Sequence, residues 1–319
     1  MKRIGILTSG GDAPGMNAAI RAVVRVALNK GLKVSGVNRG YQGLIEGDIV
    51  DMDLIFVGDI IHRGGTKLRT ARSMEFMTAE GQKRGVEVLK MFDIDGLVVI
   101  GGDGSFTGAM KLHDLGFPVV CIPATIDNDL WYTDNTIGFD TALNTVVNAI
   151  GNIRDTSSSH GRINIIEVMG RECGDIALHS GIAGGADTII VPEFGFNIDK
   201  TSKRIIEGKN RGKLHHIVIL AEGVGRPYEI ADVIENKTQM ETRVTVIGHL
   251  QRGGNPTAYD RILASRFGEK AVNLLIEEKS GLAIGNKGAD IICVNIEDAI
   301  SKRETPAENL YELANILSK

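Results

Sequence analysis

Residues 96–105 read GLVVIGGDGS, an apolar run that ends in paired glycines and an aspartate. An uninterrupted run rich in β-branched residues predicts a strand that is buried on both faces. The glycines predict a tight loop, after which a helix begins. Residues 3–12, RIGILTSGGD, repeat this order of strand, Gly-Gly-Asp and helix. Buried strands that alternate with helices are typical of parallel sheets, so both stretches indicate an α/β fold.

Similar apolar runs recur along the chain between helical patterns, which predicts two doubly wound α/β lobes with mainly parallel sheets. Strands are expected at residues 3–8, 32–38, 96–100, 118–123, 163–168, 188–191, 216–221 and 243–247. Capping residues predict helix starts at Asn255-Pro256, for a helix that runs to Glu278, and at the capping box Thr305-Pro306-Ala307-Glu308. The polar residues 155–160 are expected to form an exposed connection.

The composition excludes several classes of protein. A net charge of −4 over 319 residues gives no overall attraction to nucleic acid. No apolar run approaches the roughly 18 to 20 residues of a membrane helix, and the N-terminus does not resemble a signal peptide. Cys121, Cys173 and Cys293 are far apart and include no C-x-x-C pair, as expected for reduced core thiols. These features predict a cytoplasmic protein that binds a small molecule.

Three loops that follow predicted strands are candidates for phosphate binding. They are Ser9–Asp12, Gly101–Ser105 and Thr125–Asp129, which reads TIDND. Ligands of open α/β sheets bind beyond the carboxyl ends of the strands, where helix N-termini offer free N–H groups. The alternative is that the glycines only form tight turns. None of the loops is a Walker A or a G-x-G-x-x-G sequence.

Asp103 is informative because a carboxylate inside a phosphate cradle would repel its ligand unless a cation lay between them. Mg²⁺ is the natural cation, since one or two carboxylates and substrate phosphates usually hold it. Asp103 and one TIDND carboxylate could share a metal nucleotide, and the other could accept a proton from an attacking hydroxyl. The alternative for Asp127 and Asp129 is a helix cap or an Asx-turn.

Basic residues at the ends of predicted elements form a second set of candidates for binding phosphate. They are Arg72, Arg162, Arg171, Arg243, His249 and Arg252. The alternative for each arginine is a solvated surface position. Arg21 and Arg25 are four residues apart on one helix face, where like charges repel, so an anion could lie between them. A solvated face is the alternative there too.

These residues leave three functions to compare: a magnesium-nucleotide phosphotransferase, a nicotinamide-dependent oxidoreductase and a non-catalytic nucleotide sensor. The oxidoreductase is disfavoured because the G-x-G-x-x-G loop is absent and Asp103 would repel the dinucleotide phosphates. A sensor would have no use for a base in the TIDND stretch. The phosphotransferase is therefore the preferred interpretation.

Several longer motifs together resemble those of the bacterial ATP-dependent 6-phosphofructokinases, over essentially the whole chain. They are GGDAPGMNAAIR (10–21), GGDGS (101–105), TIDND (125–129), TIGFDTA (136–142), EVMGR (167–171), AEG (221–223) and GHLQRGG (248–254). The resemblance implies transfer of a phosphoryl group from Mg-ATP to the 1-hydroxyl of fructose 6-phosphate. It also implies a homotetramer with the active site in a cleft between two lobes. The ATP-binding lobe would be residues 1–138 with 251–301, and the sugar-phosphate-binding lobe 139–250 with 302–319.

The resemblance also implies roles for individual residues. Asp127 would be the general base and Asp103 the magnesium ligand, and the catalytic set would be Asp127, Arg72, Thr125 and Arg171. ATP would contact Gly11, Arg72, Ser73, Gly102, Asp103, Gly104 and Ser105, with Tyr41 and Gly108 nearby. The sugar phosphate would be held by Thr125, Asp127, Asp129, Met169, Gly170, Arg171, Glu222, His249 and Arg252, and by Arg162 and Arg243 of a neighbouring subunit.

The family's effector site binds ADP as activator and phosphoenolpyruvate as inhibitor. Its matching positions are Arg21, Arg25, Arg154, Gly185, Asp187, Arg211, Lys213 and His215. The family usually has glutamate at position 187 and often lysine at position 214, where this chain has Asp187 and Leu214, so we expect weak regulation. Gly104 and Ala124 differ from the aspartate and lysine of pyrophosphate-using relatives, which predicts ATP as the donor. Trp131 also departs from the family pattern, and no role is predicted for it.

Overall fold

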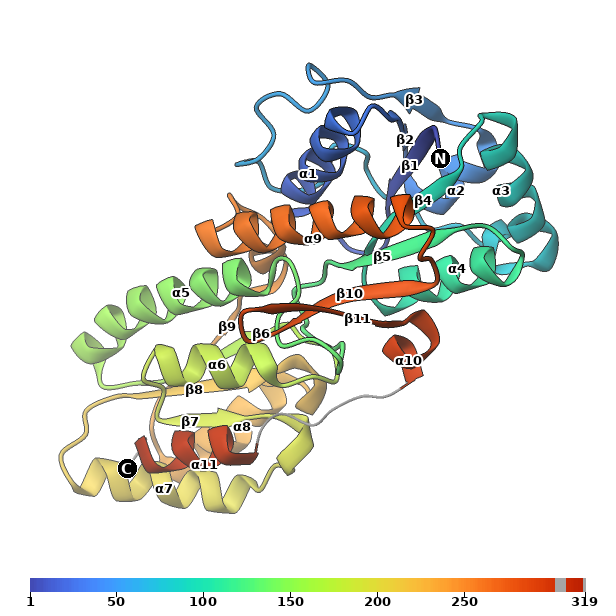
Figure 1. Cartoon of the computed structure of the whole chain (residues 1–319). Coiled ribbons are helices and arrows are strands. Elements are labelled where there is room, and N and C mark those ends of the chain that lie inside the picture. The colour runs from blue at the N-terminus through green and yellow to red at the C-terminus, as the bar shows by residue number, and fades with distance from the viewer. Residues whose placement is uncertain (302–307, 318–319) are drawn as a thin grey trace. The chain divides into compact units, whose positions relative to one another are not determined.

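The computed structural model describes residues 1–301 and 308–317 (Figure 1). The chain forms two compact units: unit 1 is Met1–Thr141 with Arg252–Glu304, and unit 2 is Ala142–Gln251 with Thr305–Lys319. The predicted start of a helix at Thr305–Ala307 lies outside the described residues, and the helix after it, α11, is Glu308–Leu317. No helix in the described part of the chain is long and apolar enough to cross a membrane.

Unit 1 is built on a seven-stranded sheet in the order β11-β10-β5-β4-β1-β2-β3. Its strands are β1 (Arg3–Thr8), β2 (Lys33–Val37), β3 (Ile49–Asp51), β4 (Gly96–Gly101), β5 (Val119–Pro123), β10 (Leu282–Lys287) and β11 (Asp290–Asn295). The pairs β2–β3 and β10–β11 are antiparallel and the others are parallel. The central strand β4 is buried along its whole length, as its apolar sequence predicts.

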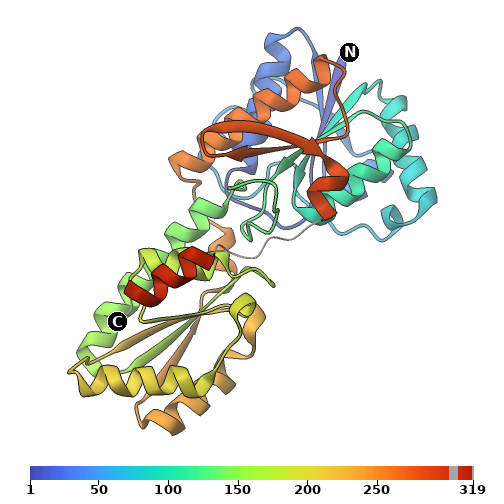
Figure 2. The same ribbon diagram turned by 60° about the horizontal axis from the view of Figure 1, so that its bottom comes forward.

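Helices cover both faces of this sheet, as Figures 1 and 2 show. On one face α1 (Met16–Asn29) packs against α9 (Ala258–Ile276). The other face carries α2 (Gly40–Glu46), η1 (Glu75–Met77), α3 (Ala79–Met91), α4 (Asp103–Asp114) and α10 (Ile296–Ser301). The core on that side includes Leu44, Phe76, Leu89, Phe106 and Leu112. A further helix, α5 (Phe139–His160), begins in unit 1 and continues into unit 2.

Unit 2 has a smaller sheet in which all strands are parallel, in the order β7-β8-β6-β9. Its strands are β6 (Ile163–Val168), β7 (Thr188–Ile190), β8 (His216–Ala221) and β9 (Thr242–Val246). Its helices, besides α5 and α11, are α6 (Asp175–Ala183), η2 (Pro192–Phe194), α7 (Ile198–Asn210), η3 (Glu222–Val224), α8 (Pro227–Thr238) and η4 (Gly248–Arg252), which crosses the boundary to unit 1. Ile165, Ile205, Val218 and Ile234 belong to its core.

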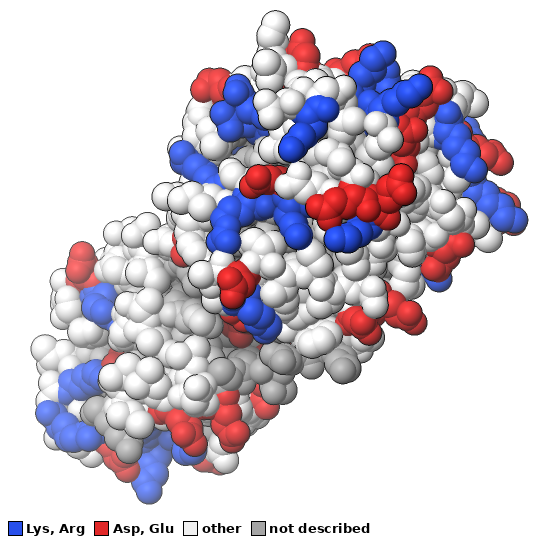
Figure 3. Space-filling view, viewed as in Figure 1, with Lys and Arg blue, Asp and Glu red and all other residues white. Residues whose placement is uncertain are grey.

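The structure confirms the α/β fold with mainly parallel sheets, and every predicted strand is present. Strands β3, β10 and β11 were not predicted from the sequence. The last two form a hairpin in which Gly285, Asn286 and Lys287 interrupt the apolar pattern. On the face that Figure 3 shows, basic and acidic side chains are interspersed.

The prediction that residues 155–160 form a connection is wrong, because they are the last turns of α5. The hydroxyl of Thr156 donates to the carbonyl of Asn152, and those of Ser158 and Ser159 donate to the carbonyl of Asp155. These bonds let polar side chains continue the helix, and Ser157 is buried.

The helix start predicted at Asn255-Pro256 is also wrong. Helix α9 begins at Ala258 and ends at Ile276, two residues before Glu278. Its N-cap is Thr257, whose hydroxyl accepts a hydrogen bond from the backbone N–H of Asp260. A threonine oxygen that faces the first turn caps a helix better than the more distant asparagine can.

Candidate active site

The three predicted phosphate loops converge in unit 1. Strands β1, β4 and β5 are neighbours, so their carboxyl ends and the loops after them meet at one edge of the sheet. The N–H of Ser9 donates to the carbonyl of Ile100 at 3.0 Å, and that of Ala124 to the carbonyl of Gly101 at 2.9 Å. The chain leaves β1 toward β2 and leaves β4 toward β5, on the opposite side. The loops therefore lie at a topological switch point, where doubly wound sheets bind ligands.

Glycine is required in these loops because the backbones approach closely. A Cβ atom on Gly101 would lie 2.4 Å from Ser105 Oγ and 2.5 Å from the carbonyl oxygen of Ser9. Gly10 has a φ of +84°, which side chains rarely adopt. A Cβ on Gly102 would be 3.6 Å from Thr125, so the loops after β4 and β5 are in contact. Gly10, Gly11 and Gly104 are exposed, so a ligand can approach the backbone at these positions.

Asp103 is the first residue of α4, at a helix N-terminus that favours phosphate. Its Oδ1 accepts the N–H of Gly104 at 2.7 Å. Among the described residues, no group of three or more His, Cys, Asp and Glu side chains could hold a metal ion. Mg²⁺ that arrives on nucleotide phosphates needs only one or two protein carboxylates. The Asp103 carboxylate would be such a ligand, and the adjoining N–H groups suit the phosphate oxygens.

Asp127 is fully buried at the end of the β5 loop. Its backbone N–H donates to Thr125 Oγ1 at 3.2 Å. Arg252 Nη2 lies 4.0 Å from Asp127 Oδ2, and Arg252 Nη1 donates to the carbonyl of Asp12 at 3.3 Å. A Cβ on Gly11 would be 2.5 Å from the same Nη1 atom. Arg252 thus offsets the charge of a buried carboxylate and joins the β1 loop to the TIDND stretch, whose Asp129 is half-buried.

Tyr41 lies beneath the β4 loop. Its hydroxyl donates to the carbonyl of Ser105 at 2.6 Å, and its ring stacks on Phe76 with centroids 4.1 Å apart. Burial raises the pKa of Tyr41 well above its usual value. A Cβ on Gly108 would be 2.7 Å from the tyrosine ring, so Gly108 leaves room for it. Tyr41 therefore supports the loop from the core.

Arg72 and Ser73 follow a segment that is tied to the end of β1. Thr8 Oγ1 lies 2.9 Å from Thr66 Oγ1 and donates to the carbonyl of Arg69 at 3.0 Å. Arg72 is exposed, and Ser73 Oγ accepts the N–H of Phe76 at 3.2 Å. These bonds place the segment beside the loop that holds Gly11.

In unit 2, several expected sugar-phosphate residues gather at the carboxyl ends of β6 and β8. Glu222 Oε1 accepts the N–H groups of Gly170 and Arg171 at 3.2 Å and 2.6 Å. Arg171 has a φ of +55° and is exposed. The N–H of Met169 donates to the side chain of Gln251 at 3.2 Å. Gln251 was not predicted as a site residue, although it lies between His249 and Arg252 in the sequence. Gln251 is fully buried, whereas His249 is exposed.

Arg162 and Arg243 lie at the opposite end of the same sheet. Arg162 precedes β6 and Arg243 is near the start of β9, and both pair with Glu241. The hydrogen bond from Arg162 holds the pKa of Glu241 below its usual value. A strand of this length spans about 20 Å, so unit 2 does not bring these arginines to Glu222. Glu241 was not predicted from the sequence, because its role includes a bond to Arg162, which is 79 residues away.

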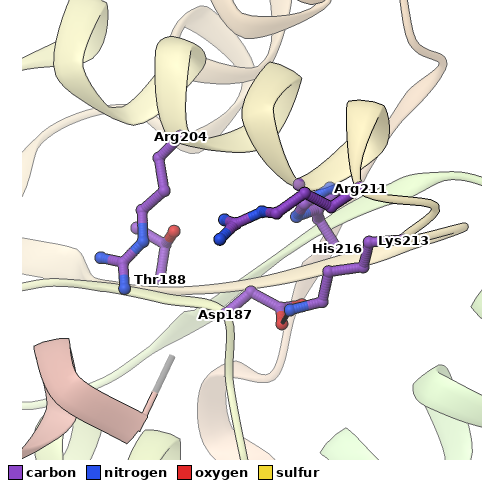
Figure 4. A pocket seen from close by; sticks show the side chains of 7 residues that line it. Asp187, Thr188, Arg204, Arg211, Lys213 and His216 are labelled. Carbon is purple, nitrogen blue, oxygen red and sulfur yellow. Dashed lines mark ion pairs between the residues drawn. The ribbon is translucent and has the colours of Figure 1, made fainter. Parts of the chain in front are cut away.

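Some of the expected effector residues line a pocket of unit 2 (Figure 4). It is lined by Asp187, Thr188, Arg204, Gly208, Arg211, Lys213 and His216. Lys213 pairs with Asp187, which also accepts the N–H of Ile217 at 2.7 Å. Arg204 and His216 were not predicted from the sequence, and the predicted His215 does not line the pocket. Burial lowers the pKa of His216.

The remaining expected effector residues lie elsewhere. Arg154 donates to the carbonyls of Gly184 and Gly185 in unit 2. Arg21 and Arg25 are on α1, in unit 1. Burial, and then the charge of Arg25, lower the pKa of Arg21, as expected for stacked cations.

Comparison with known proteins agrees with this geometry. Loops of glycine and aspartate at the switch point of a doubly wound sheet define a phosphate-binding α/β protein. A profile of the phosphofructokinase family matches residues 3–275. The ATP-dependent 6-phosphofructokinases of Alkaliphilus metalliredigens and Clostridium tetani are 61% and 59% identical, each over 318 residues and 100% of both chains. Phosphofructokinase from Saccharomyces cerevisiae has a TM-score of 0.91 and 34% identity, over 98% of this chain and 50% of the yeast chain.

The chain belongs to the phosphofructokinase family, among its ATP-dependent 6-phosphofructokinases. The resemblance found in the motifs is therefore confirmed over the full length of the chain.

Proposed function

We propose that the protein transfers the terminal phosphoryl group of Mg-ATP to the 1-hydroxyl of fructose 6-phosphate. The products are fructose 1,6-bisphosphate and ADP, in glycolysis. The observation that carries the proposal is the buried Asp127 beside Arg252, next to the glycine loops after β1 and β4. Its relatives of about 60% identity carry the name ATP-dependent 6-phosphofructokinase, which supports these substrates.

In this proposal the oxygen of the sugar hydroxyl attacks the terminal phosphorus atom of ATP, and Asp127 accepts the proton of that hydroxyl. Arg252 contributes positive charge beside the carboxylate and near the transferred group. Arg72, Thr125 and Arg171 complete the catalytic set. Mg²⁺, held by Asp103 and the nucleotide, would neutralise charge on the phosphate oxygens.

The ATP-binding residues follow from the convergent loops. Gly11, Gly102, Gly104 and Ser105 offer backbone and helix N-terminal N–H groups to phosphates, and Arg72 and Ser73 flank them. A Cβ on Gly104 would meet nothing within 4 Å, so the loop leaves open space there. That space and the uncharged Ala124 support ATP rather than pyrophosphate as donor.

The sugar phosphate would bind to Met169, Gly170, Arg171, Glu222, His249 and Arg252, with Thr125 and Asp129 close to the reacting hydroxyl. Arg162 and Arg243 would come from a neighbouring subunit of a homotetramer. Their position at the far end of the unit 2 sheet supports this sharing.

Regulation by ADP and phosphoenolpyruvate is proposed to be weak. Lys213 is already paired with Asp187, and Leu214 is exposed where a cation is common in the family. An effector anion would have to compete for Lys213. Strong sigmoidal kinetics with phosphoenolpyruvate at micromolar concentration would contradict this proposal.

The substrate assignment is tested by coupling ADP release to an optical signal. We expect release to require both fructose 6-phosphate and Mg²⁺, with no turnover when pyrophosphate replaces ATP. Turnover without the sugar phosphate, or an absorbance change with a nicotinamide instead, would refute the assignment.

A further inference from the structure

The segment that follows the TIDND stretch rests on the β10–β11 hairpin, within unit 1. The hydroxyl of Tyr132 donates to the carbonyl of Ile284 at 2.9 Å, and Asp134 Oδ2 accepts the N–H of Gly288 at 2.7 Å. A Cβ on Gly285 would be 2.7 Å from the ring of Tyr132, so only glycine allows this approach. The hairpin therefore contacts the segment along its length.

Asn286 is the centre of this contact and is almost completely buried. Its Oδ1 accepts the hydroxyl of Thr133 at 3.0 Å and the N–H of Asn135 at 3.1 Å, and its Nδ2 donates to the carbonyl of Gly288 at 3.2 Å. Its backbone donates to Thr133 Oγ1 at 2.9 Å and accepts the N–H of Asp134 at 2.9 Å. A backbone N–H only donates and a carbonyl only accepts, which fixes the orientation of the amide.

The same segment holds the backbone on both sides of Asp127. The hydroxyl of Thr136 donates to the carbonyl of Thr125 at 2.7 Å, and its N–H donates to Asn128 Oδ1 at 3.0 Å. Asn128 Nδ2 in turn donates to the carbonyl of Asp134 at 3.2 Å. Asn128 has a φ of +52°, a left-handed conformation that these bonds stabilise. Hydrogen bonds thus run from Asn286 through residues 133–136 to Thr125 and Asn128, which lie on either side of Asp127 in the chain.

We propose that Asn286 is a positioning residue that holds the carboxylate of Asp127 in place for proton transfer. It acts through residues 133–136 and is not itself a catalytic residue. The inference rests on the proposed role of Asp127 as general base. A displacement of about 1 Å at a reacting group can cost about a hundredfold in rate. We expect the loss of the Asn286 hydrogen bonds to permit a displacement of this order.

The first test is Asn286→Ala. We expect kcat to fall by about 30- to 100-fold, with KM for ATP and fructose 6-phosphate within about threefold of wild type. The matched control is Asn164→Ala, which removes another buried strand asparagine, bonded to Ser157 in unit 2. It should lower Tm comparably and leave kcat unchanged. A loss of Tm without a loss of kcat in Asn286→Ala would overturn the proposal.

A second pair of variants covers the case in which Asn286→Ala does not fold. Thr133→Val removes the hydroxyl that bonds Asn286, and Thr133→Ser keeps it. We expect Thr133→Val to lose kcat by about tenfold or more and Thr133→Ser to restore it. Equal kcat in the two variants would count against the proposal.

The decisive measurement is a double-mutant cycle with Asp127→Asn. If Asn286 acts through Asp127, Asn286→Ala should lower the residual kcat of Asp127→Asn by less than about threefold. The same fold loss in both backgrounds would overturn the proposal. Loss of kcat in Asp127→Asn but not in Asn286→Ala would refute this inference alone, whereas wild-type kcat in Asp127→Asn would refute the proposed base and the inference together.

Discussion

Two carboxylates in unit 1, Asp127 and Asp260, are fully buried, and their surroundings differ. Asp127 faces the guanidinium of Arg252, whereas Asp260 accepts the N–H groups of Gly138 and Thr141 at 2.9 Å each. Burial of a carboxylate is costly without such groups. The first arrangement suits a base, and the second fixes the start of α5.

Asp260 should make stability depend on pH. Burial raises its pKa from 3.8 to about 6. Because the pKa of Asp260 is higher in the folded state than in the unfolded state, the folded state binds the proton more tightly. The resulting contribution to the free energy of unfolding is complete below about pH 4 and is lost as pH rises through about 6. We expect wild type to lose about 1–3 kcal/mol of unfolding free energy across that range, relative to Asp260→Asn. Denaturant titrations at several pH values measure this difference.

The control for this prediction is Asp155→Asn, which removes an exposed carboxylate. It should keep the wild-type dependence on pH. Identical pH dependence in wild type and Asp260→Asn would show that Asp260 does not titrate in this range.

The residues found from the sequence differ in kind from those that were missed. Asp103, Asp127 and the glycines belong to short contiguous motifs after strands, so local sequence predicts them. Gln251, Glu241 and Asn286 act through partners 82, 79 and 151 or more residues away. These long-range bonds form only when the sheets form, so the sequence does not show them even where Gln251 lies inside the GHLQRGG motif.

At the scale of elements, the strands that were not predicted, β3, β10 and β11, all lie toward the two ends of the unit 1 sheet. β4 and β5 are apolar throughout because helices cover both faces. β10 and β11 pair as an antiparallel hairpin at the edge, and much of β11 is only half-buried. Glycine, asparagine and lysine in β10 serve the contact with residues 132–135, which a search for apolar runs overlooks.

Helix α9 provides the prediction at this scale. Thr257 caps the helix by accepting the N–H of Asp260, and its hydroxyl also donates to Asp140. Thr257→Ala should lower the free energy of unfolding by about 1–2 kcal/mol, because the cap is lost. Thr257→Ser keeps the hydroxyl and should stay close to wild type by denaturant titration. If Thr257→Ser lowered the free energy of unfolding as much as Thr257→Ala does, the stabilisation would come from the methyl group of Thr257 rather than from the cap.

For the whole molecule, the arrangement of unit 2 bears on assembly. Its sheet is entirely parallel, so the carboxyl-end residues Glu222 and Arg171 are separated from Arg162 and Arg243 at the amino ends. Glu241 holds both arginines in one chain. In the proposed homotetramer, these two arginines would complete the sugar-phosphate site of a neighbouring subunit.

Mixing of inactive variants tests this sharing. Arg243→Ala and Asp127→Asn should each have little activity alone. Hybrids of the two should contain some sites with both native residues, so turnover should return after the subunits dissociate and reassemble. Mixtures no more active than their separate components would mean that each subunit supplies its own arginine.

The most direct measurement of the proposed chemistry is the turnover of Asp127→Asn, with substrate binding measured separately by calorimetry. The isosteric amide removes the base and keeps the shape, so we expect kcat to fall by about 10²- to 10⁴-fold. Dissociation constants for ATP and fructose 6-phosphate should stay within about threefold of wild type. A kcat close to that of wild type would show that another group accepts the proton.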